Sequence, residues 1–200
     1  MNKQGGNIDF IKLFMILGVL ISGIFYFGAI VQANSDSLRI NEIAWMGTEY
    51  SSSDEWIELY NPGSVVIDLS GWTLVAQDGS PEIELSGFVD VNSYYLLERT
   101  DDFSVDDVEA QLIYTGALGN TGEYLILKNS SGEIIDEINA STAWSSGDND
   151  TKQTMPLNSG GVCVTSDDVG GTPGQENIIN NSNNESNQEE DNSSNDLEQS

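Results

Sequence analysis

Apolar and polar residues alternate along most of residues 38–139, and this period of two constrains the fold more than any other feature of the sequence. In residues 55–60, which read EWIELY, alternate side chains must point to opposite faces of an extended strand. No helical period of useful length interrupts the pattern. The predicted strands are Leu38–Trp45, Glu55–Tyr60, Val65–Leu69, Thr73–Ala76, Glu82–Leu85, Tyr94–Glu98, Gln111–Tyr114, Tyr124–Lys128 and Glu133–Ile138.

Turn-forming residues separate these strands. Proline presets φ and glycine admits positive φ, so we expect left-handed glycines at Gly63 and Gly71. Many short strands separated by such turns predict an all-β antiparallel sandwich or barrel. The turn sequences are Asn61-Pro62-Gly63, Asp68-Leu69-Ser70-Gly71, Asp78-Gly79-Ser80-Pro81, Gly119-Asn120-Thr121-Gly122 and Ser131-Gly132.

The two ends of the chain differ in composition from this β-rich middle. Leu13–Val31 carries no charge and is long enough to cross a hydrocarbon core of about 30 Å as a helix. Lys3 and Lys12 precede it, which predicts that the rest of the chain lies outside the cytoplasm. Small residues before Asn34 also fit cleavage after Ala33, so residues 1–33 are either a transmembrane anchor or a signal peptide.

Two further segments follow from composition. Residues 34–177 are predicted to form one domain, with Asp148–Asn177 as ordered loops that close it. Residues 178–200 are rich in Asn, Ser and Glu and, past Ile179, carry Leu197 as their one apolar residue. Such a segment buries too little apolar surface to offset chain entropy, so we predict a disordered acidic tail or linker.

The composition excludes several classes of function. The chain has no histidine, which removes Ser-His-Asp and Cys-His catalysis, and its single cysteine leaves no structural zinc site. We expect Cys163 to be a partly buried hydrophobic residue. With 33 acidic and 6 basic residues the net charge is −27, so nucleic acid and anionic lipid headgroups are not expected partners of the domain.

The sequence contains the blocks Asn41-Glu42-Ile43, Asp54–Asn61, Asp68–Leu74, Gly122–Leu127, Gly132–Asp136, Thr172-Pro173-Gly174 and Asn177. In this order and spacing they resemble the lamin tail domain family, an immunoglobulin-like sandwich. The resemblance covers about Leu38–Asn177 and implies a non-catalytic interaction or anchoring module. It resembles the prokaryotic exported type, because an apolar segment stands where a nuclear lamin has a heptad-repeat rod. Residues 155–163 depart from the family pattern, because relatives often have a longer loop in this region.

Carboxylates are the only residues that offer catalysis, and we assign no catalytic residue. Glu55, Glu58 and Asp54 could serve a glycoside hydrolase, which needs two carboxyl groups at one site. Glu55 and Glu58 are three apart on a strand and should face opposite sides of the sheet, which disfavours this alternative.

Tryptophans are read first as packing residues. We expect Trp45, Trp56 and Trp72 in the core or at its corners, because a buried tryptophan removes roughly 150–250 Å² from water. Trp144 precedes a Ser-Ser-Gly loop and is the one tryptophan that also fits a sugar-binding face.

Paired acids in predicted loops raise a second alternative, a calcium-dependent carbohydrate-binding module. Carboxylate oxygens are the ligands that Ca²⁺ takes, although none of the pairs has the spacing of an EF-hand loop. We therefore assign no metal or cofactor, and keep Ca²⁺ as the alternative. The sequence leaves the partner open between a protein and a cell-surface polymer. The acids are Asp101-Asp102, Asp106-Asp107, Asp148-Asn149-Asp150 and Asp167-Asp168.

Overall fold

A computed structural model describes residues 37–179, which belong to one compact unit. The predicted N-terminal helix of residues 1–33 and the predicted tail from residue 180 onward lie outside these residues. Within residues 37–179 every regular element is a strand, and no helix there has the length and apolarity to span a membrane. The prediction of an all-β domain is confirmed for this part of the chain.

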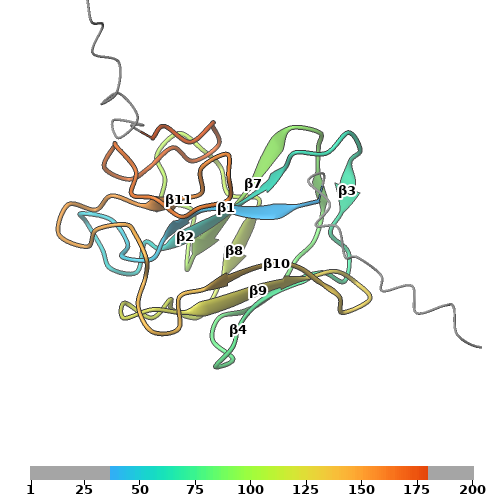
Figure 1. Ribbon diagram of the computed structural model, residues 1–200, viewed down its shortest axis with the longest axis horizontal. Helices are drawn as coiled ribbons and strands as arrows, with labels where there is room; N and C mark the ends of the chain where they lie inside the picture. The colour runs from blue at the N-terminus through green and yellow to red at the C-terminus, as the bar shows by residue number, and fades with distance from the viewer. Residues whose placement is uncertain (1–36, 180–200) are drawn as a thin grey trace, which may run out of the picture. The chain divides into compact units, whose positions relative to one another are not determined.

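Two sheets face each other in layers (Figure 1). The five-stranded sheet has the order β11-β1-β2-β7-β8 and the four-stranded sheet the order β10-β9-β4-β5, while β3 and β6 form a separate two-stranded ribbon. The strands are β1 Arg39–Ala44, β2 Trp56–Asn61, β3 Ile67–Asp68, β4 Thr73–Ala76, β5 Glu82–Glu84, β6 Phe88–Val89, β7 Ser93–Arg99, β8 Leu112–Tyr114, β9 Tyr124–Lys128, β10 Ile134–Asn139 and β11 Met155–Pro156.

The core lies between the two sheets, where the apolar faces of both meet. On the five-stranded sheet, Ile57 and Leu59 alternate along β2 with residues of the other face and are completely buried. Leu74, Leu125 and Leu127 from β4 and β9 face them from the other sheet and are equally buried. This is the packing expected of two half-buried sheets, and it explains the period of two in the sequence.

Three details of the predicted topology are corrected. β7 and β8 pair in parallel, so the sandwich is not purely antiparallel, and the long connection of residues 100–111 allows β8 to run in the same direction as β7. The two-residue strands β6 and β11 were not predicted, because each is defined by its partner strand rather than by a local pattern.

The turns follow the predicted chemistry with one exception. Gly71 has φ of 77°, as expected for a left-handed turn residue. Gly63 does not have positive φ, so that prediction is wrong. Asn61 shapes this turn instead: its Oδ1 accepts the Gly63 N–H at 3.0 Å, and its Nδ2 donates to the carbonyl oxygens of Val65, Val89 and Asp90.

Residues 148–177, which we name the closing segment, lie on the side of the five-stranded sheet that faces away from β9 and β10 (Figure 1). Only β11 and isolated bridges give this segment regular pairing. It is nevertheless anchored, since Thr154 and Thr172 are buried within it. Residues 148–177 therefore consist mainly of loops with one two-residue strand.

Candidate functional site

The outer face of the five-stranded sheet carries three rows of side chains, because residues directly opposite one another on neighbouring strands share a face. Each row crosses β1, β2 and β7 in that order. The first row is Arg39, Tyr60 and Tyr94; the second is Glu42, Glu58 and Leu96; the third is Ala44, Trp56 and Glu98.

A β-bulge at Asn41 makes the first two rows possible. Ile40 pairs with Leu59 and Glu42 pairs with Glu58, so between these pairs β1 advances by two residues while β2 advances by one. The extra residue inverts the alternation along β1. Without it, Arg39 and Glu42 would point to opposite faces of the sheet. With it, both point outward.

The second row holds the closing segment in place. Glu42 accepts hydrogen bonds from the Thr154 hydroxyl and from the backbone N–H and hydroxyl of Thr172. Glu58 accepts from Asn41 Nδ2 at 2.8 Å and from the Gly174 N–H at 2.5 Å. Both glutamates are completely buried, and neither has a basic residue as a partner. These two side chains therefore anchor the segment through its backbone and its threonines.

Burial without a counter-ion changes the acidity of this pair. Desolvation raises the pKa of Glu58 to about 8, opposed by the hydrogen bonds from Gly174 and Asn41 and reinforced by the neighbouring charge of Glu42. Desolvation also raises the pKa of Glu42, against the hydrogen bonds of Thr154 and Thr172. The cause in both cases is removal of a charged group from water.

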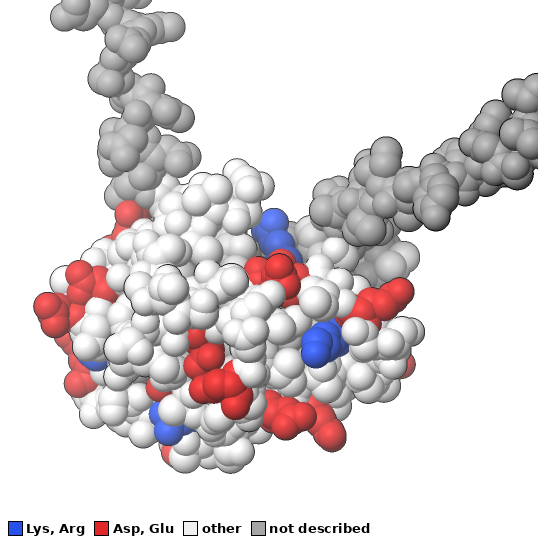
Figure 2. Space-filling view, turned by 60° about the horizontal axis from the view of Figure 1, so that its bottom comes forward, with Lys and Arg blue, Asp and Glu red and all other residues white. Residues whose placement is uncertain are grey.

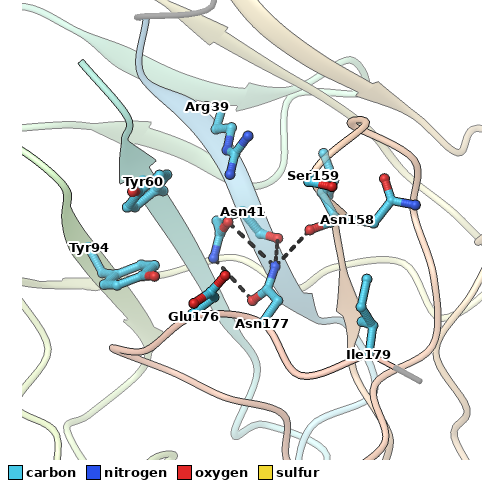
Figure 3. A pocket seen from close by; sticks show the side chains of 10 residues that line it. Arg39, Asn41, Tyr60, Tyr94, Asn158, Ser159, Glu176, Asn177 and Ile179 are labelled. Carbon is cyan, nitrogen blue, oxygen red and sulfur yellow. Dashed lines mark hydrogen bonds between the residues drawn. The ribbon is translucent and has the colours of Figure 1, made fainter. Parts of the chain in front are cut away.

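The first row is not covered by the closing segment and lines a cleft of about 470 Å³, which we name the tyrosine cleft (Figure 3). Figure 3 places the tyrosines and the Asn158–Ser159 turn on opposite sides of it. One side comes from the strands, and the other comes from the closing segment and Ile179. The lining residues are Arg39, Asn41, Tyr60, Tyr94, Leu157, Asn158, Ser159, Glu176, Asn177 and Ile179.

Aromatic and cationic groups are stacked in the tyrosine cleft. The rings of Tyr60 and Tyr94 lie 4.8 Å apart at 31°, and the Arg39 guanidinium lies 5.0 Å from the centre of the Tyr60 ring. Arg39 Nε is buried without a hydrogen-bond partner. Burial, followed by the nearby charge of Glu58, raises the pKa of Tyr94 to about 12, so its hydroxyl stays protonated and can donate.

Two asparagines form the floor of the tyrosine cleft and join its two sides. Asn41 Nδ2 donates to Asn177 Oδ1 at 3.2 Å, and Asn177 Nδ2 donates to the carbonyl oxygens of Leu157 at 2.9 Å and of Asn41 at 3.2 Å. These amide groups are committed to holding the closing segment on β1. On the rim, Asn158 Oδ1 is also engaged, because it accepts the N–H groups of Gly160 and Val162.

The carboxylates proposed for a hydrolase have separate structural surroundings. Glu55 forms an ion pair with Arg99 at 3.2 Å and accepts the Leu118 N–H at 2.7 Å, whereas Glu58 lies beneath the closing segment. Burial raises the pKa of Glu55 to about 6, against its bonds to Leu118 and Arg99. Asp54 accepts a hydrogen bond from the Thr48 hydroxyl. These carboxylates share no hydrogen-bond partner.

The tryptophans pack as predicted, with one change of layer. Trp45 is buried, and Trp56 is also buried, but on the outer face beneath the closing segment rather than between the sheets. Trp72 is partly buried against the core. Trp144 stacks on Trp45 with ring centres 5.8 Å apart and 7° between planes, and its Nε1 donates to the Gly119 carbonyl at 2.7 Å. This contact occupies one ring face of Trp144, which therefore braces its loop.

The acidic loops use several of their carboxylates to shape the backbone. Asp148 Oδ1 accepts the N–H groups of Asp150 and Thr151, and these bonds, that of Thr151 first, lower the pKa of Asp148. Asp102 Oδ1 accepts the Ala110 N–H at 2.8 Å. In residues 37–179 no three Asp, Glu, Cys or His side chains gather closely enough to hold a metal ion. The predicted half-buried state of Cys163 is confirmed.

Charge is distributed without a basic patch on the face drawn in Figure 2, where acidic side chains are spread over the surface and basic ones stand singly between them. Two of the basic side chains have internal partners. Arg99 pairs with Glu55, and Lys152 Nζ donates to Met46 O and Asn149 Oδ1. Arg39 is the basic residue that lines the tyrosine cleft.

The fold and the sequence blocks now define the family. A profile described as Lamin Tail Domain matches residues 31–142, which is more than half of the chain, and the chain belongs to that family. A search of curated proteins found no match. The matched residues include the strands β1 to β10 but end before the closing segment. The strand side of the tyrosine cleft therefore lies within the family match, and Asn158, Ser159 and Glu176 lie outside it.

Sequence reasoning missed the tyrosine cleft altogether. Arg39, Tyr60 and Tyr94 are far apart in the sequence, and only the register of three strands brings them into one row. A signal did exist: Arg39 is a rare basic residue on a predicted strand of a very acidic chain. That signal identifies one residue of the cleft, but not its neighbours.

Proposed function

We propose that this chain is a non-catalytic interaction module whose sandwich is held outside the cytoplasm, where it engages a surface partner. The N-terminal segment either anchors it in the membrane or directs its export before cleavage between Ala33 and Asn34. The partner is a protein or a cell-surface polymer. The module needs no cofactor for this role, and only the N-terminal segment contacts lipid.

One observation carries the non-catalytic part of the proposal: the three buried carboxylates Glu42, Glu55 and Glu58 are engaged in holding the fold. Glu42 and Glu58 bind the closing segment, and Glu55 binds Arg99 and Leu118. A general acid and a general base must both reach the reacting atoms of one substrate, whereas these carboxyl groups lie in different surroundings. Membership of a family of immunoglobulin-like interaction domains supports the same role.

The residues before the sandwich support its placement. Lys3 and Lys12 flank the start of a long apolar segment, and the chain after it is strongly acidic. Such an asymmetry keeps the basic end in the cytoplasm. The acidic surface also disfavours nucleic acid as the partner, because counterion release needs basic contacts to phosphates.

Placement is tested on intact cells that express the full-length chain with a C-terminal epitope tag. An impermeant protease added outside should remove the tag without cell lysis. Protection of the tag until lysis would overturn the placement. Mass spectrometry of the mature N-terminus then separates the two export modes, since a chain that begins at Asn34 has lost its signal peptide.

Catalysis and calcium are tested on the same purified chain. We expect no turnover of polysaccharides by the wild type or by Glu55→Gln and Glu58→Gln; turnover that either substitution abolishes would make the chain a hydrolase. We expect millimolar calcium to leave the melting temperature unchanged, because the proposed module has no calcium site. A ligand that binds only the folded state would raise the melting temperature. A rise would favour the calcium-dependent module.

A further inference from the structure

We propose that the tyrosine cleft binds a neutral oligosaccharide of hexopyranose units, with Tyr60 and Tyr94 as the stacking surface. The inference rests on the proposed function, because it names a ligand class for the interaction module. It adds a definite site. Trp144, the residue that the sequence offered for sugar binding, is not part of that site.

The two tyrosine rings have no packing role that would account for their position. They lie on the outer face of the sheet, away from the core between the two layers, and the closing segment covers the neighbouring rows but not theirs. Both are half-buried, and within residues 37–179 the Tyr60 hydroxyl donates one long hydrogen bond of 3.5 Å to Asn92 Oδ1. A tyrosine that offers an apolar ring and a polar tip to a cleft suits a ligand that has both kinds of surface.

The rim of the tyrosine cleft supplies both donors and acceptors. Ser159 and Glu176 are exposed there, Asn158 is half-buried, and Arg39 lies above Tyr60. A sugar hydroxyl is at once a donor and an acceptor, so it needs partners of both kinds at short range. The Ser159 hydroxyl provides both, and the carboxylate of Glu176 provides acceptors. The guanidinium and the Asn158 amide nitrogen provide donors, while Asn158 Oδ1 accepts the N–H groups of Gly160 and Val162. The volume of about 470 Å³ falls within the range of roughly 300–1,000 Å³ that is typical of small-molecule sites.

Charge favours a neutral ligand over an acidic one. Among the described residues that line the cleft, Arg39 is the one cation and Glu176 the one anion, so these charges nearly cancel. The chain as a whole carries −27, which repels sulfated or uronic polymers at long range. A peptide ligand is less suited, since the nearby edge strand β11 has only two residues to pair with an added strand.

The test uses the full-length chain, kept in solution by a detergent without a sugar headgroup, because a glycosidic detergent would compete for the cleft. The chain is applied to immobilised oligomers of glucose and of N-acetylglucosamine, in α- and β-1,4 linkage where available, beside uronic acid and sulfated oligomers. We expect retention on at least one neutral oligomer. Retention on acidic oligomers alone, or on none, would overturn the proposal.

Two cleft variants and one control assign any binding to the site. Tyr94→Ala removes a stacking ring, and Ser159→Trp fills the cleft from an exposed position, so at least the second should leave the melting temperature unchanged. Each should weaken neutral-oligomer binding at least tenfold. Tyr50→Ala makes the same chemical change at a side chain that is 92% exposed and outside the cleft, and should bind like the wild type. Binding that persists in both cleft variants would refute the assignment.

The outcome is separable from that of the proposed function. A tag found inside the cell, or a carboxylate-dependent turnover, would remove the proposed function whatever the oligomers do. If the chain lies outside the cell and has no enzymatic activity but binds none of the neutral oligomers, only the saccharide inference is removed. Both experiments use the same full-length chain.

Discussion

The strands and the closing segment are held to the fold by different forces. The strands between β1 and β10 pair through backbone ladders and bury an apolar face, as Leu59 and Leu125 illustrate. The closing segment has one two-residue strand and is fixed by hydrogen bonds to the buried side chains of Glu42 and Glu58. The first region depends mainly on area removed from water. The second buries Met155 and Leu157 and depends in addition on a few polar contacts that a single substitution can break.

The difference teaches where a ligand site can arise on this sandwich. The tyrosine cleft lies at the boundary of the two regions, with Tyr60 and Tyr94 on rigid strands and Ser159 on the closing segment. Ligand sites are often built from loops positioned by such a scaffold. Changes in the closing segment would therefore alter the cleft without altering the sandwich.

The largest expected effect comes from the core of the strand region. Leu59→Ala should lower the free energy of unfolding by about 2–5 kcal/mol, because it leaves a cavity at a completely buried position. Denaturant titration followed by tryptophan fluorescence measures it. Val66→Ala, at a position 52% exposed, is the control and should change stability by less than about 0.5 kcal/mol. Equal effects of the two variants would contradict the assignment of the core.

A glycine pair tests the closing segment alone. Gly170 and Gly171 have φ of 79° and 72°, so alanine at either should cost about 1–3 kcal/mol of backbone strain. A Cβ at Gly171 would also overlap Glu42 Oε1 and the Thr154 hydroxyl, whereas one at Gly170 meets open space. Gly171→Ala should therefore destabilise more than Gly170→Ala and expose the segment to limited proteolysis. Matching losses in the two variants would show that Glu42 does not anchor the segment.

The acid pair makes stability depend on pH. The pKa of Glu58 is about 8 in the folded protein, well above its usual value of 4.5, so the folded state retains a proton that the unfolded state has lost. Stability should fall as pH rises toward and through about 8, by at most about 1.4 kcal/mol per pH unit for this group. The raised pKa of Glu42 acts in the same direction.

Thermal melts between pH 5 and 9 measure this slope. Glu58→Gln removes one titrating group and should reduce the slope, to which Glu42 still contributes. The amide loses one of the two hydrogen bonds, which lowers stability at acidic pH. The control is Glu84→Gln, at an exposed glutamate on β5, which should leave the slope as in the wild type. Stability that rises over this range would refute the assigned direction.

The smallest expected effect is that of the acidic C-terminus. Deletion of residues 180–200 should leave the melting temperature unchanged, because this part of the sequence has only Leu197 to bury. Differential scanning calorimetry of the full-length and shortened chains compares them. A fall of several degrees would mean that these residues pack on the sandwich.

Prediction from the sequence succeeded where the local pattern carries the information. The segments of β4 and β9 were predicted with their observed bounds, and Gly71 with its positive φ, because alternation and turn chemistry act over a few residues. It failed for the parallel β7–β8 pair and for β6 and β11, where a partner distant in the sequence defines the strand. Glu58 was read as a candidate acid or base, and its partner Gly174 is 116 residues away.

By itself, the sequence determined that residues 38–139 form short strands in a sandwich or barrel, since the period of two and the turn residues predict half-buried strands. The two separate sheets of the structure decide for the sandwich. The sequence also determined the exclusion of histidine-based chemistry. The tertiary structure alone decided which side chains meet on the outer face. The bulge at Asn41 places Arg39 and Glu42 on that face together, and the register of β1, β2 and β7 then aligns the arginine with two tyrosines. Alternation specifies which residues share a face of one strand, but register is a property of strands paired across long stretches of chain.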